Sequence, residues 1–75
     1  MMTAEETQVL SYLRQRPFAA ATDVARSCLA DASPEWVGRV ISRLDWFGYV
    51  VVFYGPGGGL AALQITDKGL RHSGR

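Results

Sequence analysis

The residues best suited to chemistry in this 75-residue chain are two arginines, Arg39 and Arg43, which stand four positions apart. A guanidinium group can donate two hydrogen bonds to the edge of a guanine base, and it can also pair with a phosphate. On a helix, a rotation of about 100° per residue places Arg39 on a polar stripe and Arg43 at the edge of that stripe. The pattern therefore predicts a surface that contacts base edges, formed by Ser33, Glu35, Gly38, Arg39, Ser42 and Arg43.

The neighbours of these arginines allow two interpretations. Gly38 and Ser42 are small enough to permit a close approach, whereas the carboxylate of Glu35 repels phosphate unless it accepts a hydrogen bond from a cytosine amine. In the first interpretation, Arg39 contacts guanine and Arg43 meets a phosphate. In the second, both arginines are solvated surface groups that pair with an acidic side chain nearby, namely Glu35, Asp45 or Asp31.

A helix over 33–47 is expected to position these side chains. Ser33 and Pro34 form an N-cap followed by a residue favoured at the first helical position. Gly48 suits a left-handed C-terminal cap. Apolar residues recur at the spacing of a helix packed on one side, which predicts a buried face of Val37, Val40, Ile41, Leu44 and Phe47.

An N-terminal helix is expected before this segment. Thr3 and Glu6 have the spacing of a capping box, and the helix behind them should end before Pro17. Residues 18–20 are expected to form an edge strand or an extended link.

A second helix is expected over 23–29, capped by Thr22. Its inward-facing residues should be Val24, Ala25, Cys28 and Leu29. With residues 30–32 as the turn, this helix and the helix over 33–47 form a helix-turn-helix. We expect Thr22 and Arg26 to contact phosphates.

The C-terminal part of the chain predicts a β-hairpin. Residues 49–54 and 60–65 have the composition of strands, and they flank the glycine-rich segment 55–59. Backbone N–H groups at Gly57 and Gly58 can approach a phosphate, although a mobile turn is the simpler explanation of these glycines. Thr66 is expected to cap a last short helix over 67–71.

Two aromatic residues, Trp46 and Phe53, are predicted to form a partner surface. Trp46 falls on the exposed stripe of the helix over 33–47, where a tryptophan favours contact with another molecule. The alternative is that Trp46 folds back on the hairpin against Tyr49 or Val51. Phe53 lies on one side of its strand, and only one side of a two-stranded hairpin can cover the helices. Trp36 is expected to be packed.

The composition argues against several other functions. The chain has a net charge of +1, one cysteine (Cys28) and one histidine (His72). Cys28 is expected to be a buried apolar residue, and neither residue has a second metal ligand near it, so we expect no metal and no cofactor. No catalytic arrangement of residues is visible, and an enzyme is not expected. The acidic N-terminus and the lack of a run of about 20 apolar residues predict neither a signal peptide nor a membrane span, which makes the cytoplasm the expected location.

The segment 37–50 resembles the recognition helix and first wing strand of bacterial winged helix-turn-helix regulators of the MarR-like and PadR-like groups. The resemblance is carried by Val37, Arg39, Arg43, Leu44 and Gly48. The segment 63–69 is similar to the end of their second wing strand and the turn into the next helix. The wing tip departs from the pattern, because it lacks the arginine or lysine that these families usually carry.

We therefore expect an α+β fold with 1–75 as a single domain. The expected architecture is a small winged helix-turn-helix: a three-helix bundle, a two- or three-stranded β-wing and a short C-terminal helix. The resemblance implies a sequence-specific transcriptional regulator that binds double-stranded DNA as a homodimer, with the helix over 33–47 in the major groove. The alternative is a winged-helix module that binds a protein partner and not DNA.

Overall fold

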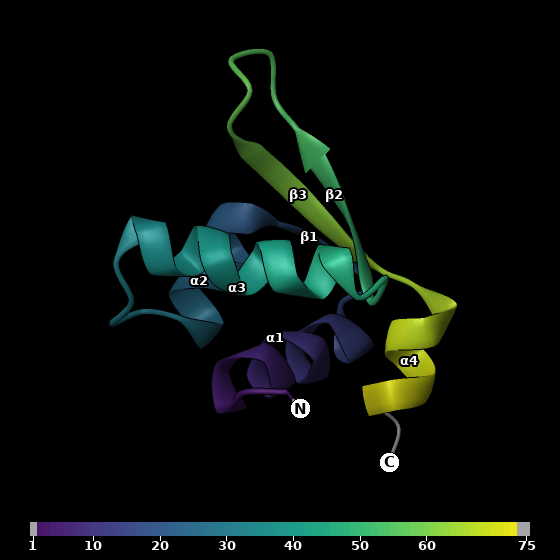
Figure 1. The fold of residues 1–75 in the computed structure, drawn as a ribbon. Helices are drawn as coiled ribbons and strands as arrows, with labels where there is room; N and C mark the ends of the chain where they lie inside the picture. The colour runs from purple at the N-terminus through teal and green to yellow at the C-terminus, as the bar shows by residue number, and fades with distance from the viewer. Residues whose placement is uncertain (1, 74–75) are drawn as a thin grey trace.

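The computed structural model describes residues 2–73, which form four helices and a three-stranded antiparallel sheet (Figure 1). In chain order the elements are α1 (Ala4–Gln15), β1 (Phe18–Ala20), α2 (Ala21–Cys28), α3 (Pro34–Trp46), β2 (Val50–Tyr54), β3 (Leu60–Ile65) and α4 (Asp67–Ser73). The strand order is β1-β3-β2, so β1 is the edge strand that the sequence allowed. The expected α+β winged helix-turn-helix is confirmed, with three strands in its sheet. No helix in the described part of the chain is long and apolar enough to cross a membrane.

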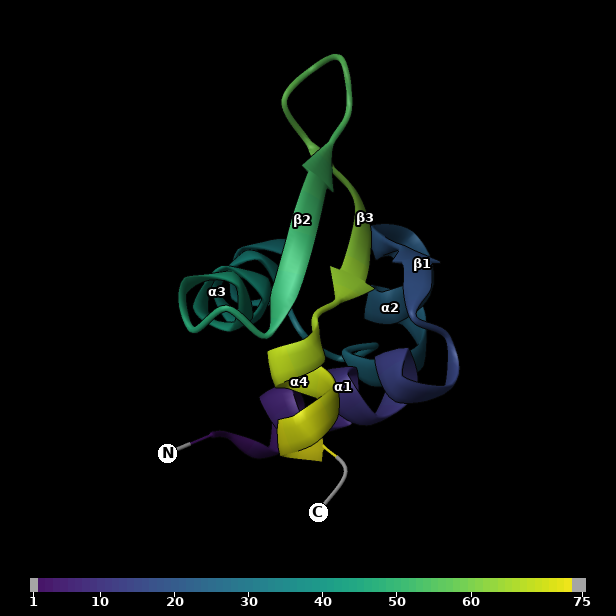
Figure 2. The same ribbon diagram turned by 90° about the vertical axis from the view of Figure 1, so that its right-hand side faces the viewer.

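The core lies where the helices meet the inner part of the sheet. Figures 1 and 2 show the hairpin of β2 and β3 extending away from the helical bundle, with its loop at the far end of the molecule. Burying a Leu, Ile or Val side chain contributes about 1.5–3 kcal/mol. The fully buried apolar side chains come from three helices and two strands: Val9, Leu10, Leu13, Val24, Ile41, Leu44, Val50 and Leu63.

Helix α1 begins at the predicted capping box. Thr3 Oγ1 accepts a hydrogen bond from the backbone N–H of Glu6 at 3.2 Å, and Glu6 Oε1 accepts one from the N–H of Thr3 at 2.9 Å. Two N–H groups that the first turn leaves unpaired are thereby satisfied. The helix ends at Gln15, before Pro17, as expected.

The predicted start of α2 is wrong. The helix begins at Ala21, directly after β1, and its N-cap is Ala20, which makes no side-chain cap hydrogen bond. Pairing of Ala19 and Ala20 with Leu63 and Ala62 of β3 fixes the chain up to this point, so Thr22 falls inside the first turn. Of the residues expected to face inward, Val24 and Leu29 are buried, whereas Ala25 and Cys28 are partly exposed.

Helix α3 has the predicted ends. Ser33 Oγ accepts a hydrogen bond from the N–H of Trp36 at 3.1 Å, and Pro34 occupies the first turn. Gly48 has a φ of +83°, the left-handed conformation that a glycine adopts without strain. The buried face is narrower than predicted: Val40, Ile41 and Leu44 are buried and Val37 is partly buried, but Phe47 is 37% exposed. Phe47 is the C-cap, beyond the last helical turn.

The start of helix α4 is hydrogen-bonded to the backbone at the C-terminal end of α3. Thr66 Oγ1 accepts from the N–H of Gly69 at 3.1 Å, as the expected cap, and donates to the carbonyl oxygen of Gly48 at 2.6 Å. Lys68 Nζ donates to the carbonyl oxygen of Phe47 at 2.6 Å. These two bonds satisfy carbonyl groups just past α3, where a cation is also favourable.

Gly69 allows α4 to pass close to the start of the hairpin. A Cβ at this position would collide with the carbonyl oxygen of Tyr49 and would lie 2.8 Å from Cγ1 of Ile65. Because one of these neighbours is backbone, a side chain cannot be accommodated by a simple rotation. The glycine of the segment 63–69 is therefore a packing requirement.

We predict that Gly69→Ala lowers the free energy of unfolding by about 1–3 kcal/mol, because the added methyl group overpacks this contact. Urea unfolding followed by circular dichroism measures the change. Gly57→Ala is the matched control, since nothing lies within 4 Å of a Cβ at that position, and it should leave stability nearly unchanged. Equal stabilities of the two variants would contradict the prediction.

Candidate nucleic-acid interface

An open groove of about 660 Å³ lies between α3 and the loop end of the β2–β3 hairpin. Its lining contains all the predicted base-contact residues except Ser33: Glu35, Gly38, Arg39, Ser42 and Arg43. Ser33 uses its hydroxyl oxygen to cap α3. The opposite wall is formed by Tyr54 and Leu60, which are partners in the β2–β3 register. Sequence reasoning missed these two, although strand alternation places Tyr54 on the same side of β2 as the buried Val50.

Arg39 is the cation of this groove that the fold itself does not use. Its side chain is exposed, and within residues 2–73 it forms no hydrogen bond or ion pair. The alternative prediction for Arg39 is therefore wrong: in the structure it does not pair with Glu35, Asp45 or Asp31. Its guanidinium donors are available to a ligand in the groove.

Arg43 has a structural partner that the sequence analysis did not identify. Its Nε lies 2.6 Å from Oε2 of Glu6, and its guanidinium carbon lies 5.2 Å from the centre of the Phe47 ring. The Arg43 side chain is 50% exposed, whereas that of Glu6 is 1% exposed. The suggested pairing with Glu35, Asp45 or Asp31 is wrong for this arginine, because Glu6 of α1 occupies it.

Glu6 consequently links the first turn of α1 to the last turn of α3. One carboxylate oxygen accepts from the N–H of Thr3, and the other accepts from Arg43 Nε. A buried carboxylate is tolerated only when both its charge and its hydrogen-bonding capacity are satisfied. Within residues 2–73, no buried side-chain nitrogen or oxygen lacks a hydrogen-bond partner.

We predict that Arg43→Met lowers the free energy of unfolding by about 1.5–3 kcal/mol, the usual worth of a hydrogen bond to a charged group. The loss arises because the buried carboxylate of Glu6 is left without its hydrogen-bonded cation. Arg39→Met is the matched control and should change stability by no more than about 0.5 kcal/mol. Chemical denaturation measures both, and a tolerated Arg43→Met would contradict the assigned role of the ion pair.

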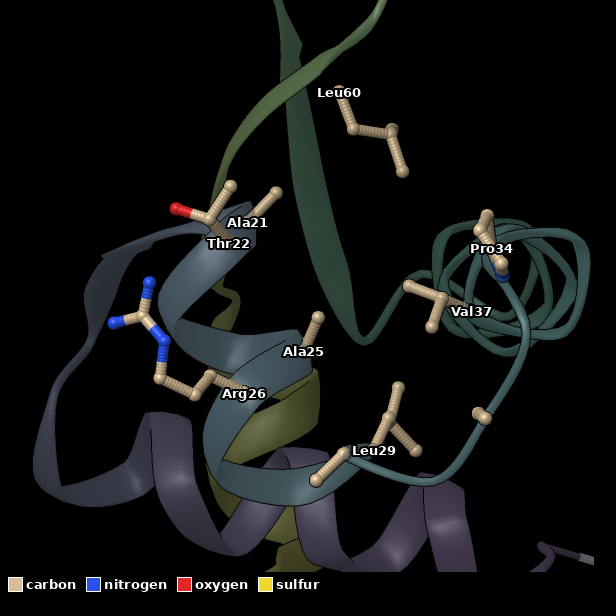
Figure 3. Close-up of a pocket in the computed structure, with 10 residues that line it drawn as sticks. Ala21, Thr22, Ala25, Arg26, Leu29, Pro34, Val37 and Leu60 are labelled. Carbon is tan, nitrogen blue, oxygen red and sulfur yellow. The ribbon is translucent and has the colours of Figure 1, made fainter.

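The second helix contributes Thr22 and Arg26, the predicted phosphate contacts. Both side chains are exposed, and Arg26 lies 3.4 Å from Asp23 in an exposed pair that contributes little to stability. Figure 3 shows the Arg26 guanidinium directed away from the apolar side chains of Leu29 and Val37, which line a hollow of about 500 Å³ between α2 and α3. Leu60 lines both this hollow and the groove along α3, so the two are adjacent.

The tip of the hairpin fits the phosphate prediction less well. The N–H of Gly58 donates to the carbonyl oxygen of Gly55 at 2.9 Å, and the N–H of Gly55 donates to Gly59 at 2.8 Å. Gly58 has a φ of +83°, as a tight turn requires. The N–H of Gly58 is therefore engaged within the turn, and Gly57 is the one of the two predicted glycines that can offer its N–H to a phosphate.

The aromatic residues singled out in the sequence differ in how far other side chains cover them. Trp46 is 85% exposed, so its predicted exposure is confirmed and the alternative, folding back on the hairpin, is wrong. Trp36 is 41% exposed and is not packed as expected, because it lies beside the turn before α3 and not over the core. Phe53 packs edge to face against Phe18 of β1 with ring centres 5.5 Å apart, so β1 covers part of that predicted partner surface.

Cys28 and His72 have ordinary structural surroundings. Burial raises the pKa of the Cys28 thiol, and its Sγ lies 3.7 Å from the carbonyl oxygen of Gln8. His72 stacks against Tyr49 with ring centres 4.9 Å apart. Neither residue lines the groove along α3.

A helix-turn-helix whose second helix shares a groove with a β-hairpin defines a winged helix-turn-helix protein. The structural neighbours of this chain are MarR-family winged-helix transcriptional regulators, which confirms the resemblance to the MarR-like group. No protein-family model and no curated protein sequence matches the chain.

Three solved structures illustrate the similarity. The PcaV transcriptional regulator from Streptomyces coelicolor matches 99% of this chain and 54% of its own, with 27% sequence identity and a TM-score of 0.83. Bordetella bronchiseptica BpsR, whose DNA binding is regulated by 6-hydroxynicotinic acid, matches 96% of this chain and 53% of its own, with 25% identity and a TM-score of 0.77. The C80S mutant of E. coli MarR, solved in complex with operator DNA, matches 96% and 52% with 17% identity and a TM-score of 0.72, and so shares the fold. This chain spans about half the length of each of these proteins.

Proposed function

We propose that this chain is the DNA-binding part of a transcriptional regulator and places α3 in the major groove of double-stranded DNA. The observation that carries the proposal is Arg39, which has no hydrogen bond or ion pair within the described residues and lies in a groove that also contains Gly38 and Ser42. Helix α3 has 13 residues and is therefore about 20 Å long. The major groove is about 12 Å wide, which is wide enough to admit an α-helix. Binding as a homodimer to a two-fold symmetric site is part of the proposal.

Gly38 gives independent support. A glycine inside a helix costs about 0.5–1 kcal/mol relative to alanine, and a Cβ at Gly38 would meet no atom within 4 Å. The fold therefore gains nothing from this glycine. Its position on the groove side of α3 is explained if another molecule approaches the helix backbone closely there.

We predict that Gly38→Gln makes the fold more stable and DNA binding weaker. Glutamine is the better helix former by about 0.5 kcal/mol, but its side chain obstructs the groove. A clash of about 1.4 kcal/mol lowers affinity tenfold. Urea unfolding and fluorescence anisotropy with a random-sequence duplex at low salt measure the two effects. Ser11→Gln, on the exposed side of α1, is the control, and equal affinities of the two variants would count against the proposal.

The proposed phosphate contacts are Thr22 and Arg26, which line the adjacent hollow, and Gly57 in the hairpin loop. We predict that Arg26→Ala flattens the plot of log affinity against log salt by about 0.9, because one fewer counterion is released from the DNA. Arg71→Ala, on α4 and outside the groove, removes the same charge and serves as the control. A salt series with the random duplex measures both slopes, and identical slopes would remove Arg26 from the interface.

Trp46 favours a second candidate function, a winged-helix module that binds a protein partner. Trp46 is 85% exposed, and tryptophan is enriched among the residues that contribute most of the binding energy at protein interfaces. NMR titration with random duplex DNA at low salt separates the two candidates. Shifts confined to α3 and the start of α2 support DNA binding, while no shifts at millimolar DNA would leave the protein-binding module.

A further inference from the structure

Glu35, Arg39 and Ser42 form one line along the exposed side of α3. Their spacings of four and three residues place them one above another on a helix. All three are exposed and line the same groove. With a rise of about 1.5 Å per residue, Glu35 and Arg39 are about 6 Å apart along the axis, which is close to two base-pair steps of about 3.4 Å.

Glu35 and Arg39 also have the spacing at which a glutamate and an arginine commonly pair on a helix surface. Within residues 2–73 they do not form an ion pair. The groove therefore presents an acceptor-only group and a donor-only group side by side. This combination is complementary to the edges of G·C pairs, since guanine offers the acceptors O6 and N7 and cytosine offers the donor N4 amine.

We propose that Glu35 and Arg39 determine the DNA sequence that this chain selects. Glu35 requires a cytosine and Arg39 requires a guanine, and the two bases lie about two base-pair steps apart. The inference rests on the proposed function. Arg39 donates two hydrogen bonds to O6 and N7 of guanine, and Glu35 accepts one from the N4 amine of cytosine. Ser42 and Tyr54 flank these two contacts in the groove.

The role of Glu35 is selection and not affinity. A carboxylate beside the phosphate backbone weakens binding to every sequence, and only a cytosine amine in contact with it offsets that repulsion. A chain with a net charge of +1 has little positive charge with which to bind DNA indiscriminately. The glutamate on the groove side of α3 is thus explained if it lowers the affinity for sites that lack a cytosine at the contacted position.

Selection from a random duplex library tests this inference. The wild-type chain should enrich sites with a guanine and a cytosine at two fixed positions, each preferred about 5- to 150-fold, which corresponds to 1–3 kcal/mol per base contact. Glu35→Gln should replace the cytosine preference by adenine, because a glutamine side chain pairs with N6 and N7 of adenine. The guanine preference should persist in Glu35→Gln and disappear in Arg39→Ala.

Asp45→Asn is the matched control, because it removes the same charge from an exposed position of α3 outside the groove lining. It should raise affinity for all duplexes slightly and leave the selected sequence unchanged. Circular dichroism confirms that each variant is folded. If Glu35→Gln selects the same sites as the wild type, or if the wild type binds duplexes without selecting a sequence, the inference is wrong while DNA binding stands. If the folded wild type binds no duplex at low salt, the proposed function fails and the inference with it.

Discussion

The ion pair between Glu6 and Arg43 is the contact on which the placement of α3 depends. Its carboxylate is almost wholly buried and joins two elements that are 37 residues apart in the chain. A buried charge holds its neighbours in one arrangement, because displacing Arg43 would leave the buried carboxylate of Glu6 without its partner. Around this pair, α1 and α3 enclose the core with Val9, Leu13, Ile41 and Leu44.

The ion pair also gives the two arginines on α3 different roles. Both arginines line the groove, but Arg43 also pairs with the buried Glu6 of α1 and so helps to position the helix, whereas Arg39 has no partner within residues 2–73. One helix can serve both purposes because successive side chains are rotated by about 100° around its axis and therefore meet different neighbours. The proposed interface therefore stands on a rigid element, which keeps its donors and acceptors at fixed distances from one another.

The parts of the fold that were predictable from the sequence are those decided locally. Caps at Thr3, Ser33 and Thr66 involve groups three residues apart, so residue types at fixed spacing identify them. The exposed stripe of α3 followed from helical periodicity alone. Long-range contacts are not predictable in this way: the spacing of Thr3 and Glu6 predicts the cap, but nothing near Glu6 in the sequence indicates its contact with Arg43. The start of α2 was missed for a related reason, since pairing of β1 with a strand more than forty residues later sets it.

The fastening of α4 to α3 has a mechanical consequence. Thr66 and Lys68 bind the carbonyl groups of Gly48 and Phe47, and Gly69 lies against Tyr49. Helix α4 therefore cannot rotate about its own axis without either breaking these bonds or pulling the C-terminal end of α3 with it. A displacement of α4 would therefore be transmitted to the C-terminal end of α3, through the hydrogen bonds to Gly48 and Phe47.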